Sequence, residues 1–375
     1  MSKNGLYFDY NATTAVHPIV KAAFPNLLET YGNPSSLYET GRSAKAALET
    51  ARDQVAHFIG AESDHVIFTS SGTESVNQVF RTILWRYLLE KEPQHVIISA
   101  IEHSCCRVPC DQLSQLGIAV TVVPVSSSGH VNPADVLDAI KPETSLISIM
   151  LANNEVGTIQ PVQEIVNSVK DHPALVHTDA VQALGKIPVN VQALGVDFLS
   201  ISGHKVYAPK GIGALYVKDM ATLSPLLLGG SQEQKKRAST ENVPGAMALG
   251  LALEKIPYFD YDQTLKANLI SGVKQLPGSI LHTPSNNSLW NTVCVGFEGV
   301  DGHALAMNLD LEGIAVSTGS ACSTGSIDPS SVLTAMGVND DINKASIRLS
   351  MGLKTTKEEI ELLIQKLQGI LGRLK

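Results

Sequence analysis

Short apolar runs alternate with longer amphipathic stretches through much of the chain. Runs rich in Val, Ile and Leu predict strands at residues 65–69, 95–99, 119–125, 145–151, 175–178, 198–202 and 213–217. Apolar runs this continuous are typical of strands that helices cover on both faces. Because helical stretches separate the runs, the pattern predicts an α/β domain with a mostly parallel, seven-stranded sheet.

The pattern changes after about residue 255. Residues 290–297 and 346–350 predict strands, and residues 303–311 predict a helix. A last helix is predicted after Thr356, which has Glu359 at the spacing of a capping box and is followed by apolar residues at helical period. We therefore expect a second, smaller α/β domain at the C-terminal end.

Composition extends this picture and excludes some functions. A length of 375 residues predicts two domains, and 44% hydrophobic residues suffice for sizeable cores. We expect residues 15–255 to form the large domain, and residues 1–14 and 256–375 to form the small one. The net charge of −8 argues against a nucleic-acid partner, which would require a basic surface.

Neither a membrane segment nor a disulfide framework is expected. No apolar run reaches the ~20 residues of a membrane span, and the N-terminal residues lack the apolar core of a signal peptide. We therefore expect a cytoplasmic protein without a membrane partner. The five cysteines are few and odd in number, which favours reduced thiols.

Polar residues stand at or just after the ends of several predicted strands, and ligands of parallel sheets bind beyond the carboxyl ends of strands. Two of these sites carry specific chemistry. Lys205 closes the segment Ser-Ile-Ser-Gly-His-Lys and is placed to form a Schiff base, while Asp179 can face a pyridinium nitrogen. Pyridoxal phosphate (PLP) requires both roles. The alternatives are a solvated surface lysine and a helix-capping aspartate.

Further residues can complete a PLP site. Gln182 follows Asp179 at a spacing that places both on one face, so it can donate to the phenolic oxygen of the cofactor. The segment around Gly72 and Thr73 follows a strand and opens a helix, so its backbone amides can hold a phosphate. Ser71 and Glu74 also fit a plain capping box. Ser202 and His204 can add two further donors.

His103 follows a predicted strand and could stack on the pyridine ring and move protons near neutral pH, or be an ordinary polar residue. The next three cysteines, Cys105, Cys106 and Cys110, lack convincing zinc-ligand spacing, and we interpret them as core residues of a helix. We expect no resident metal site.

Two candidate residues lie in the predicted small domain. Cys322 stands in a Ser/Gly-rich loop at 317–326, where a thiol has no structural purpose and could act as a nucleophile on a moving loop. Arg348 lies inside a predicted strand, where it could clamp a substrate carboxylate or form an ordinary ion pair. Asn153 and Asn154 end another predicted strand and bring side-chain amides to the same crevice.

Taken in order, these motifs give a resemblance to a known family. The chain resembles the group I (NifS/IscS-like) cysteine desulfurases of the class-V aminotransferases. The resemblance is carried by residues 7–14, 32–36, 102–103, 153–160, 179 with 182, 202–205, 320–322 and 346–352.

The resemblance implies a PLP-dependent transferase of fold type I and assigns roles to named residues. PLP would be held by Gly72, Thr73, Asn154, Asp179, Gln182, Ser202, His204 and Lys205. Thr240 would reach the phosphate of the cofactor in a neighbouring subunit, which implies a homodimer. Arg348 would bind the carboxylate of L-cysteine. Cys322 would take the sulfur as a persulfide for a sulfur-acceptor protein, releasing L-alanine, and could ligate a transient iron–sulfur cluster.

Some positions depart from the family pattern. Ser231 and Ser239 stand where the family usually has glycine, which affects the expected backbone geometry there. Two other functions stay open on sequence grounds. One is another PLP reaction, such as an aminotransferase or a cysteine, cystine or selenocysteine lyase that needs no protein thiol. The other is a non-catalytic relative that acts as a docking subunit.

Overall fold

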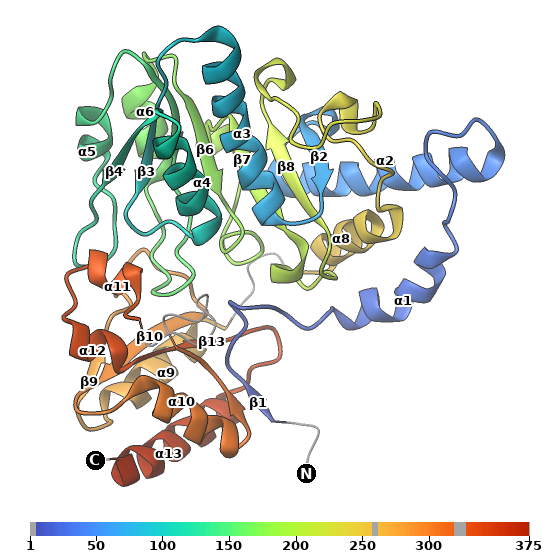
Figure 1. The fold of residues 1–375 in the computed structure, drawn as a ribbon. Helices are drawn as coiled ribbons and strands as arrows, with labels where there is room; N and C mark the ends of the chain where they lie inside the picture. Colours follow the sequence, from blue (N-terminus) through green and yellow to red (C-terminus); the bar gives the residue numbers. More distant parts are fainter. Residues whose placement is uncertain (1–4, 257–261, 319–327, 375) are drawn as a thin grey trace.

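A computed structural model describes residues 5–256, 262–318 and 328–374. A mostly parallel, seven-stranded sheet forms the centre of the larger part of the molecule (Figure 1). Of the seven strands described, β8 alone runs opposite to the other six. The predicted sheet is thus confirmed. Its strand order is β2 (Val66–Thr69), β8 (Gly213–Val217), β7 (Phe198–Ser202), β6 (Leu175–Asp179), β5 (Thr144–Ser148), β3 (His95–Ser99) and β4 (Ala119–Val123).

Two strands of the large sheet end earlier than predicted. The fourth predicted strand extended to residue 151, but β5 ends at Ser148. Beyond it the chain still bonds to β6, since the Leu151 amide donates to the Asp179 carbonyl oxygen. The Asn153 side chain then accepts the amides of Glu155 and Val156, which turns the chain away from the sheet. The edge strand β4 likewise ends at Val123, two residues early.

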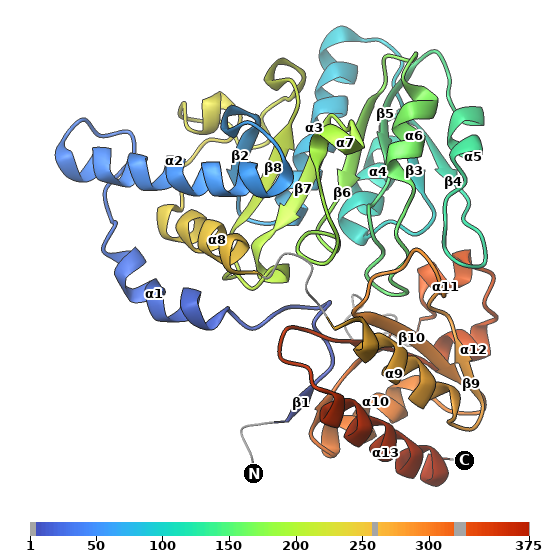
Figure 2. The same cartoon turned by 180° about the vertical axis from the view of Figure 1, so that it is seen from behind.

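Helices cover both faces of the large sheet, as the apolar strands require (Figures 1 and 2). Neighbouring residues of one strand serve opposite faces: Ile67 packs with the α3 and α4 side, and Phe68 with the α2 and α8 side. One face carries α3 (Gly72–Glu90) and α4 (Ser104–Gln115), and the other carries α2 (Glu39–Ile59), α6 (Val162–Val169) and α8 (Val243–Lys255).

The C-terminal part has its own antiparallel, four-stranded sheet and its own core. Phe8, Phe297, Ile347 and Leu363 are fully buried in that core. The sheet order is β12 (Ser317–Thr318), β13 (Ser346–Ser350), β10 (Thr292–Phe297) and β9 (Ser279–Leu281), and the main helices are α9 (Gln263–Lys274), α10 (Gly302–Leu311) and α13 (Lys357–Leu374).

The N-terminal residues join this C-terminal part. Strand β1 (Leu6–Tyr7) lies beside the C-terminal part in Figure 1. It pairs in parallel with β11 (Ile314–Ala315), and Asp9 forms a bridge to Ser350. Separate cores and this N-terminal pairing support the expected division into residues 15–255 and residues 1–14 with 256–375, which stays a prediction.

The remaining helices are short or peripheral. Helix α1 (Pro18–Leu28) lies beside α8. The extended segment between α1 and α2 projects from the rest of the molecule (Figures 1 and 2). The others are α5 (Pro133–Asp138), α7 (Val191–Leu194), α11 (Ser331–Ala335) and α12 (Asp340–Lys344). Within the residues described, no helix combines the length and the apolar character needed to cross a membrane.

Candidate active site

A cavity of about 310 Å³ opens at the carboxyl ends of β6 and β7. It is bounded by strand ends of the large sheet, by the start of α3 and α4, by the N-terminal segment and by Arg348 of β13. This is the edge at which the strand-end polar residues were expected to meet. The structure brings these predicted site residues to its wall: Gly72, Thr73, His103, Asn154, Asp179, Gln182, Ser202, His204, Lys205 and Arg348.

Two predicted site residues are not placed in this wall. Thr240 is exposed and does not line the cavity of its own chain. Cys322 belongs to residues 319–327, which lie outside the described residues, and so does most of the predicted Ser/Gly-rich loop.

Asp179 ends β6 and is only 7% exposed. Its Oδ1 accepts the Val181 amide at 2.9 Å, and the Cys105 thiol donates to Oδ2 at 3.9 Å. Burial raises the pKa of the Asp179 carboxyl, while the Val181 amide and the charges of His103 and Lys205 oppose that rise. A buried carboxylate with one oxygen so weakly bonded suits a cationic N–H donor in the cavity.

Lys205 follows β7 in the short turn Gly203–Lys205. The turn is tight, since a Cβ on Gly203 would lie 2.8 Å from Cγ2 of Ile212. The Lys205 amine points to the N-terminal segment, where it donates to the carbonyl oxygens of Asn11 and Ala12. The large sheet therefore supplies the lysine, and the N-terminal segment holds its amine.

His103 caps the N-terminus of α4, with Nδ1 accepting the Cys105 amide at 3.2 Å. Burial lowers the pKa of His103, and the charges of Lys205 and Arg107 lower it further against the opposing field of Asp179. The ring is therefore neutral near pH 7, which suits an aromatic face or a proton acceptor in the cavity.

The start of α3 is suited to an anion. Ser71 caps the helix by accepting the Glu74 amide, and among the residues described the amides of Gly72 and Thr73 have no partner. A Cβ on Gly72 would lie 2.6 Å from Cγ2 of Val181, so only glycine fits there. The predicted capping box forms only in part, because Glu74 bonds to Ser70 and Arg237 instead of the Ser71 amide.

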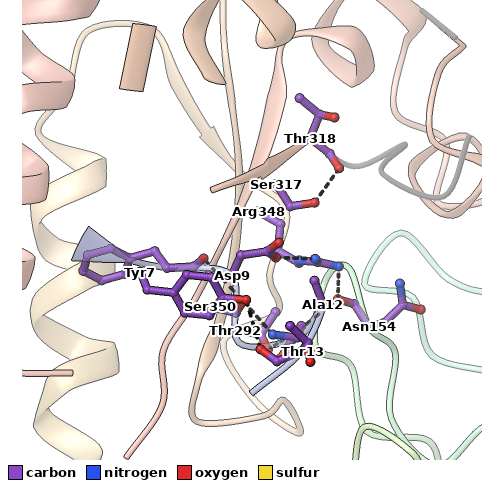
Figure 3. Close-up of polar contacts among 12 residues, drawn as sticks. Tyr7, Asp9, Ala12, Thr13, Asn154, Thr292, Ser317, Thr318, Arg348 and Ser350 are labelled. Carbon is purple, nitrogen blue, oxygen red and sulfur yellow. Dashed lines mark hydrogen bonds and ion pairs between the residues drawn. The ribbon is translucent and has the colours of Figure 1, made fainter. Parts of the chain in front are cut away.

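Arg348 forms the ion pair that its position in a strand allowed, and its role as a carboxylate clamp stays a prediction. Its guanidinium forms a 2.7 Å ion pair with Asp9 and donates to the Asn154 carbonyl oxygen at 2.9 Å (Figure 3). The same side chain lines the cavity, and its buried Nε lacks a partner in the described residues. The ion pair thus fixes a cation at the cavity wall, and within the described residues one of its N–H donors is unused.

Sequence reasoning missed several residues at this site. Asn11 is 1% exposed, lines the cavity and binds Asn154, Thr292 and Asn291. Its place in the N-terminal motif was the available signal. Lys186 donates to Gln182, and the sequence signal for it was its position four residues after Gln182.

The three neighbouring cysteines differ in their surroundings. Cys106 and Cys110 are buried in the core beside α3, as expected. The interpretation of Cys105 needs correction, because it also lines the cavity and contacts Asp179. Position on the helix decides this, since Cys105 lies in the first turn of α4, next to the strand ends. Burial and nearby carboxylates raise the pKa of its thiol far above the usual range, so it is not a thiolate.

Comparison with known proteins agrees with this geometry. Residues 6–363 match the family model "Aminotransferase class-V". The chain is 44% identical over 381 aligned positions to the cysteine desulfurase IscS of Dictyoglomus turgidum, covering 100% of this chain and 96% of that protein. It is also 42% identical to the cysteine desulfurase IscS of Methanosarcina thermophila, covering 99% of this chain and 93% of that protein.

Solved structures give the same result. A protein described as NifS-like superposes with a TM-score of 0.92 at 37% identity, covering 99% of this chain and 100% of that one. Enzymes of the class-V family depend on PLP. The chain belongs to the class-V aminotransferase family and, within it, to the NifS/IscS-like cysteine desulfurases.

Proposed function

We propose that this cysteine desulfurase binds PLP in the 310 Å³ cavity, removes sulfur from L-cysteine and carries it as a persulfide on Cys322. The observation that carries the proposal is the meeting of Lys205, Asp179 and Arg348 at one cavity, although one follows β7, one ends β6 and one lies in β13.

The residues present fit the cofactor. Lys205 would hold it covalently, and the buried Asp179 carboxylate would accept from its pyridine nitrogen. The unpartnered amides of Gly72 and Thr73 would hold its phosphate, with Ser202 and His204 beside them. The neutral His103 ring would lie against its aromatic face, and Gln182 would donate to its phenolic oxygen. When bound, PLP supplies an electron sink that acidifies the substrate Cα.

The other residues act on the substrate. Arg348 and Asn154 bind the cysteine carboxylate and thereby orient Cα toward Lys205, whose amine moves the proton. The Cys322 thiolate then attacks the substrate sulfur as the carbon–sulfur bond breaks. The electron pair of that bond remains with the carbon fragment, which takes up protons and leaves as alanine. One cysteine and one thiol thus give one alanine and one persulfide, with no external oxidant.

A second copy and a sulfur acceptor complete the proposal. Thr240 is exposed and lies outside the cavity of its own chain, which supports a role at the phosphate site of a neighbouring subunit. Large apolar side chains are also exposed on the projecting segment before α2 and near residue 228, with Tyr31 78%, Leu37 89% and Leu228 72% exposed, as in a homodimer interface.

A structure described as SspA in complex with cysteine, at a TM-score of 0.84 and 34% identity, covering 92% of this chain and 98% of that one, supports L-cysteine as substrate. The name IscS of the curated relatives supports an iron–sulfur scaffold among the acceptor proteins.

The decisive experiment replaces the thiol. Cys322→Ala should retain the visible absorption of bound PLP but lose alanine and sulfide formation from L-cysteine in the presence of a reductant. Mass spectrometry should find the persulfide on Cys322 in the unsubstituted protein. Cys110→Ala, which removes a thiol buried in the core, serves as the matched control and should keep the persulfide. Unchanged sulfide release by Cys322→Ala would favour a lyase instead.

A further inference from the structure

A second lysine lies buried behind the cofactor cavity. Lys186 is 9% exposed, and its amine donates to Gln182 Oε1 at 2.6 Å and to Asn11 Oδ1 at 3.0 Å. Among the described residues both of these partners are neutral side chains, and no carboxylate pairs with the amine. A buried amine without a counter-ion is costly to maintain, so a role in the site it supports is worth testing.

The bonds of Lys186 fix the amide of Gln182. Gln182 Nε2 donates to the Asn11 carbonyl oxygen at 2.9 Å, and that oxygen can only accept. Oε1 of the same amide therefore faces Lys186, which satisfies it. One Nε2 proton is used by Asn11, and the second is free to point into the cavity that Gln182 lines.

Asn11 is held in the same way. Its Oδ1 accepts from Lys186 and from Asn291, and its Nδ2 donates to the Asn154 carbonyl oxygen and to Thr292. The backbone carbonyl of Asn11 in turn accepts from Lys205. The two lysine amines therefore meet at one buried asparagine, and both lysines line a second cavity of about 10 Å³.

Local backbone geometry sets the direction of Lys186. The chain makes a short helical turn after Asp179, since the amides of Ala183 and Leu184 donate to the Ala180 carbonyl oxygen. Gly185 then adopts φ +72°, a left-handed conformation that ends the turn. The next residue is Lys186, whose amine reaches back to Gln182.

We propose that Lys186 is a positioning residue, which holds the Gln182 amide with its free N–H toward the phenolic oxygen of the cofactor. The proposal rests on the proposed PLP site. The charged groups that act on Lys186 are Lys205 and Arg348, both cationic, and burial is the larger cause of its lowered pKa. The orienting bonds persist in either protonation state, because a neutral amine still has two N–H donors.

The test is the pH titration of the visible absorption of bound PLP, which depends on hydrogen bonds to its phenolic oxygen. Lys186→Met removes the donor, so the Gln182 amide is released and the titration midpoint should rise by about one pH unit. Lys186→Gln can still donate to Gln182, so its titration midpoint should lie between those of Lys186→Met and the unsubstituted protein. Lys266→Met is the matched control, because Lys266 is also partly buried and bonded to neutral oxygens but does not line the cavity.

A double substitution tests whether Lys186 acts through Gln182. In a Gln182→Leu protein, adding Lys186→Met should move the midpoint no further. An unchanged midpoint in Lys186→Met, or a full additional shift in the double variant, would overturn the proposal. Thermal unfolding of the cofactor-free variants checks that they fold. If the unsubstituted protein bound no PLP, the proposed function itself would fail, and that outcome is distinct from a missing shift.

Discussion

The carboxyl edge of the large sheet and the surroundings of Arg348 form two walls of one cavity, and they are assembled differently. The first, here the cofactor wall, consists of residues that end a strand of the large sheet, closely follow one or begin the next helix. They are Gly72, Thr73, His103, Asp179, Ser202, His204 and Lys205. The second, here the clamp wall, consists of Asn11, Asn154 and Arg348, together with Asp9 as the ion-pair partner of Arg348.

Sequence separation distinguishes the two walls. The bonds of the clamp wall join residues 339 apart for Arg348 and Asp9, 194 apart for Arg348 and Asn154, and 143 apart for Asn11 and Asn154. The large sheet supplies every residue of the cofactor wall, and the Lys205 amine is held by the N-terminal segment. The clamp wall needs the N-terminal segment and the C-terminal part to be docked as well, so the proposed binding of the substrate carboxylate depends on the docking of these parts.

The largest expected effect comes from breaking the clamp wall alone. Arg348→Lys loses the planar fork that can hold Asp9 and a substrate carboxylate together, so kcat/KM for L-cysteine should fall about 10- to 100-fold. Asp9→Asn keeps a hydrogen-bond acceptor for Arg348 but removes the ion pair. It should lower kcat/KM by a smaller factor, mainly through a higher KM. Steady-state kinetics measures both.

The cofactor wall provides the control for these two variants. The visible absorption of bound PLP should stay as in the unsubstituted protein, since neither substitution touches Asp179 or Lys205. Loss of that absorption in both variants would show that the two walls are not separable.

An effect of intermediate size, on stability, is expected at Glu155, the residue next to Asn154 of the clamp wall. Glu155 is partly buried and accepts from Ser330, the residue that caps α11. Burial raises the pKa of the Glu155 carboxyl from 4.5 to about 7, against the opposing fields of Arg348 and Arg107. The folded protein therefore holds this proton more tightly than the unfolded chain, and the associated stability is present below about pH 4.5 and lost as pH rises to about 7.

Glu155→Gln should remove the part of the pH-dependent loss of stability that comes from Glu155. The free energy of unfolding of the variant should fall less between about pH 5 and about pH 8, by on the order of 1–3 kcal/mol. Denaturant titrations at the two pH values measure it. Glu102 is also buried, with a pKa raised to about 8, and remains in the variant, so the pH dependence should shrink without disappearing. An unchanged slope would show that Glu155 is ionised in the folded protein at both pH values.

The smallest effect is expected away from both walls. Ser239 stands where the family usually has glycine, and its φ of +94° is in the region that favours glycine. Ser239→Gly should therefore raise the free energy of unfolding by up to about 1 kcal/mol. Ser231→Gly is the matched comparison, because Ser231 has no positive φ. This variant should lower the free energy of unfolding by roughly a few tenths of a kcal/mol, since glycine adds conformational entropy to the unfolded chain. A gain in both variants would show that the backbone conformation of Ser239 is not the cause.

The sequence alone was sufficient where local pattern and local chemistry coincide. The last helix shows this, because Thr356 and Glu359 form the reciprocal bonds of the predicted capping box. Asp179 and Lys205 show it for the site. Asp179 ends one buried apolar strand and Lys205 follows another, and parallel strands bring their carboxyl ends to one edge whatever the rest of the chain does.

Only the tertiary structure decided the second wall and the support behind the first. Whether Arg348 pairs with a carboxylate or faces a cavity depends on Asp9 and Asn154, which no local pattern connects to it. Cys105 and Cys106 are neighbours with the same chemistry, yet a helical turn directs one to Asp179 and the other to the core. The roles of Asn11 and Lys186 depend likewise on hydrogen bonds that form only when the N-terminal segment packs against the large sheet. Periodicity reports which faces are buried, but it does not report which distant residue supplies the partner.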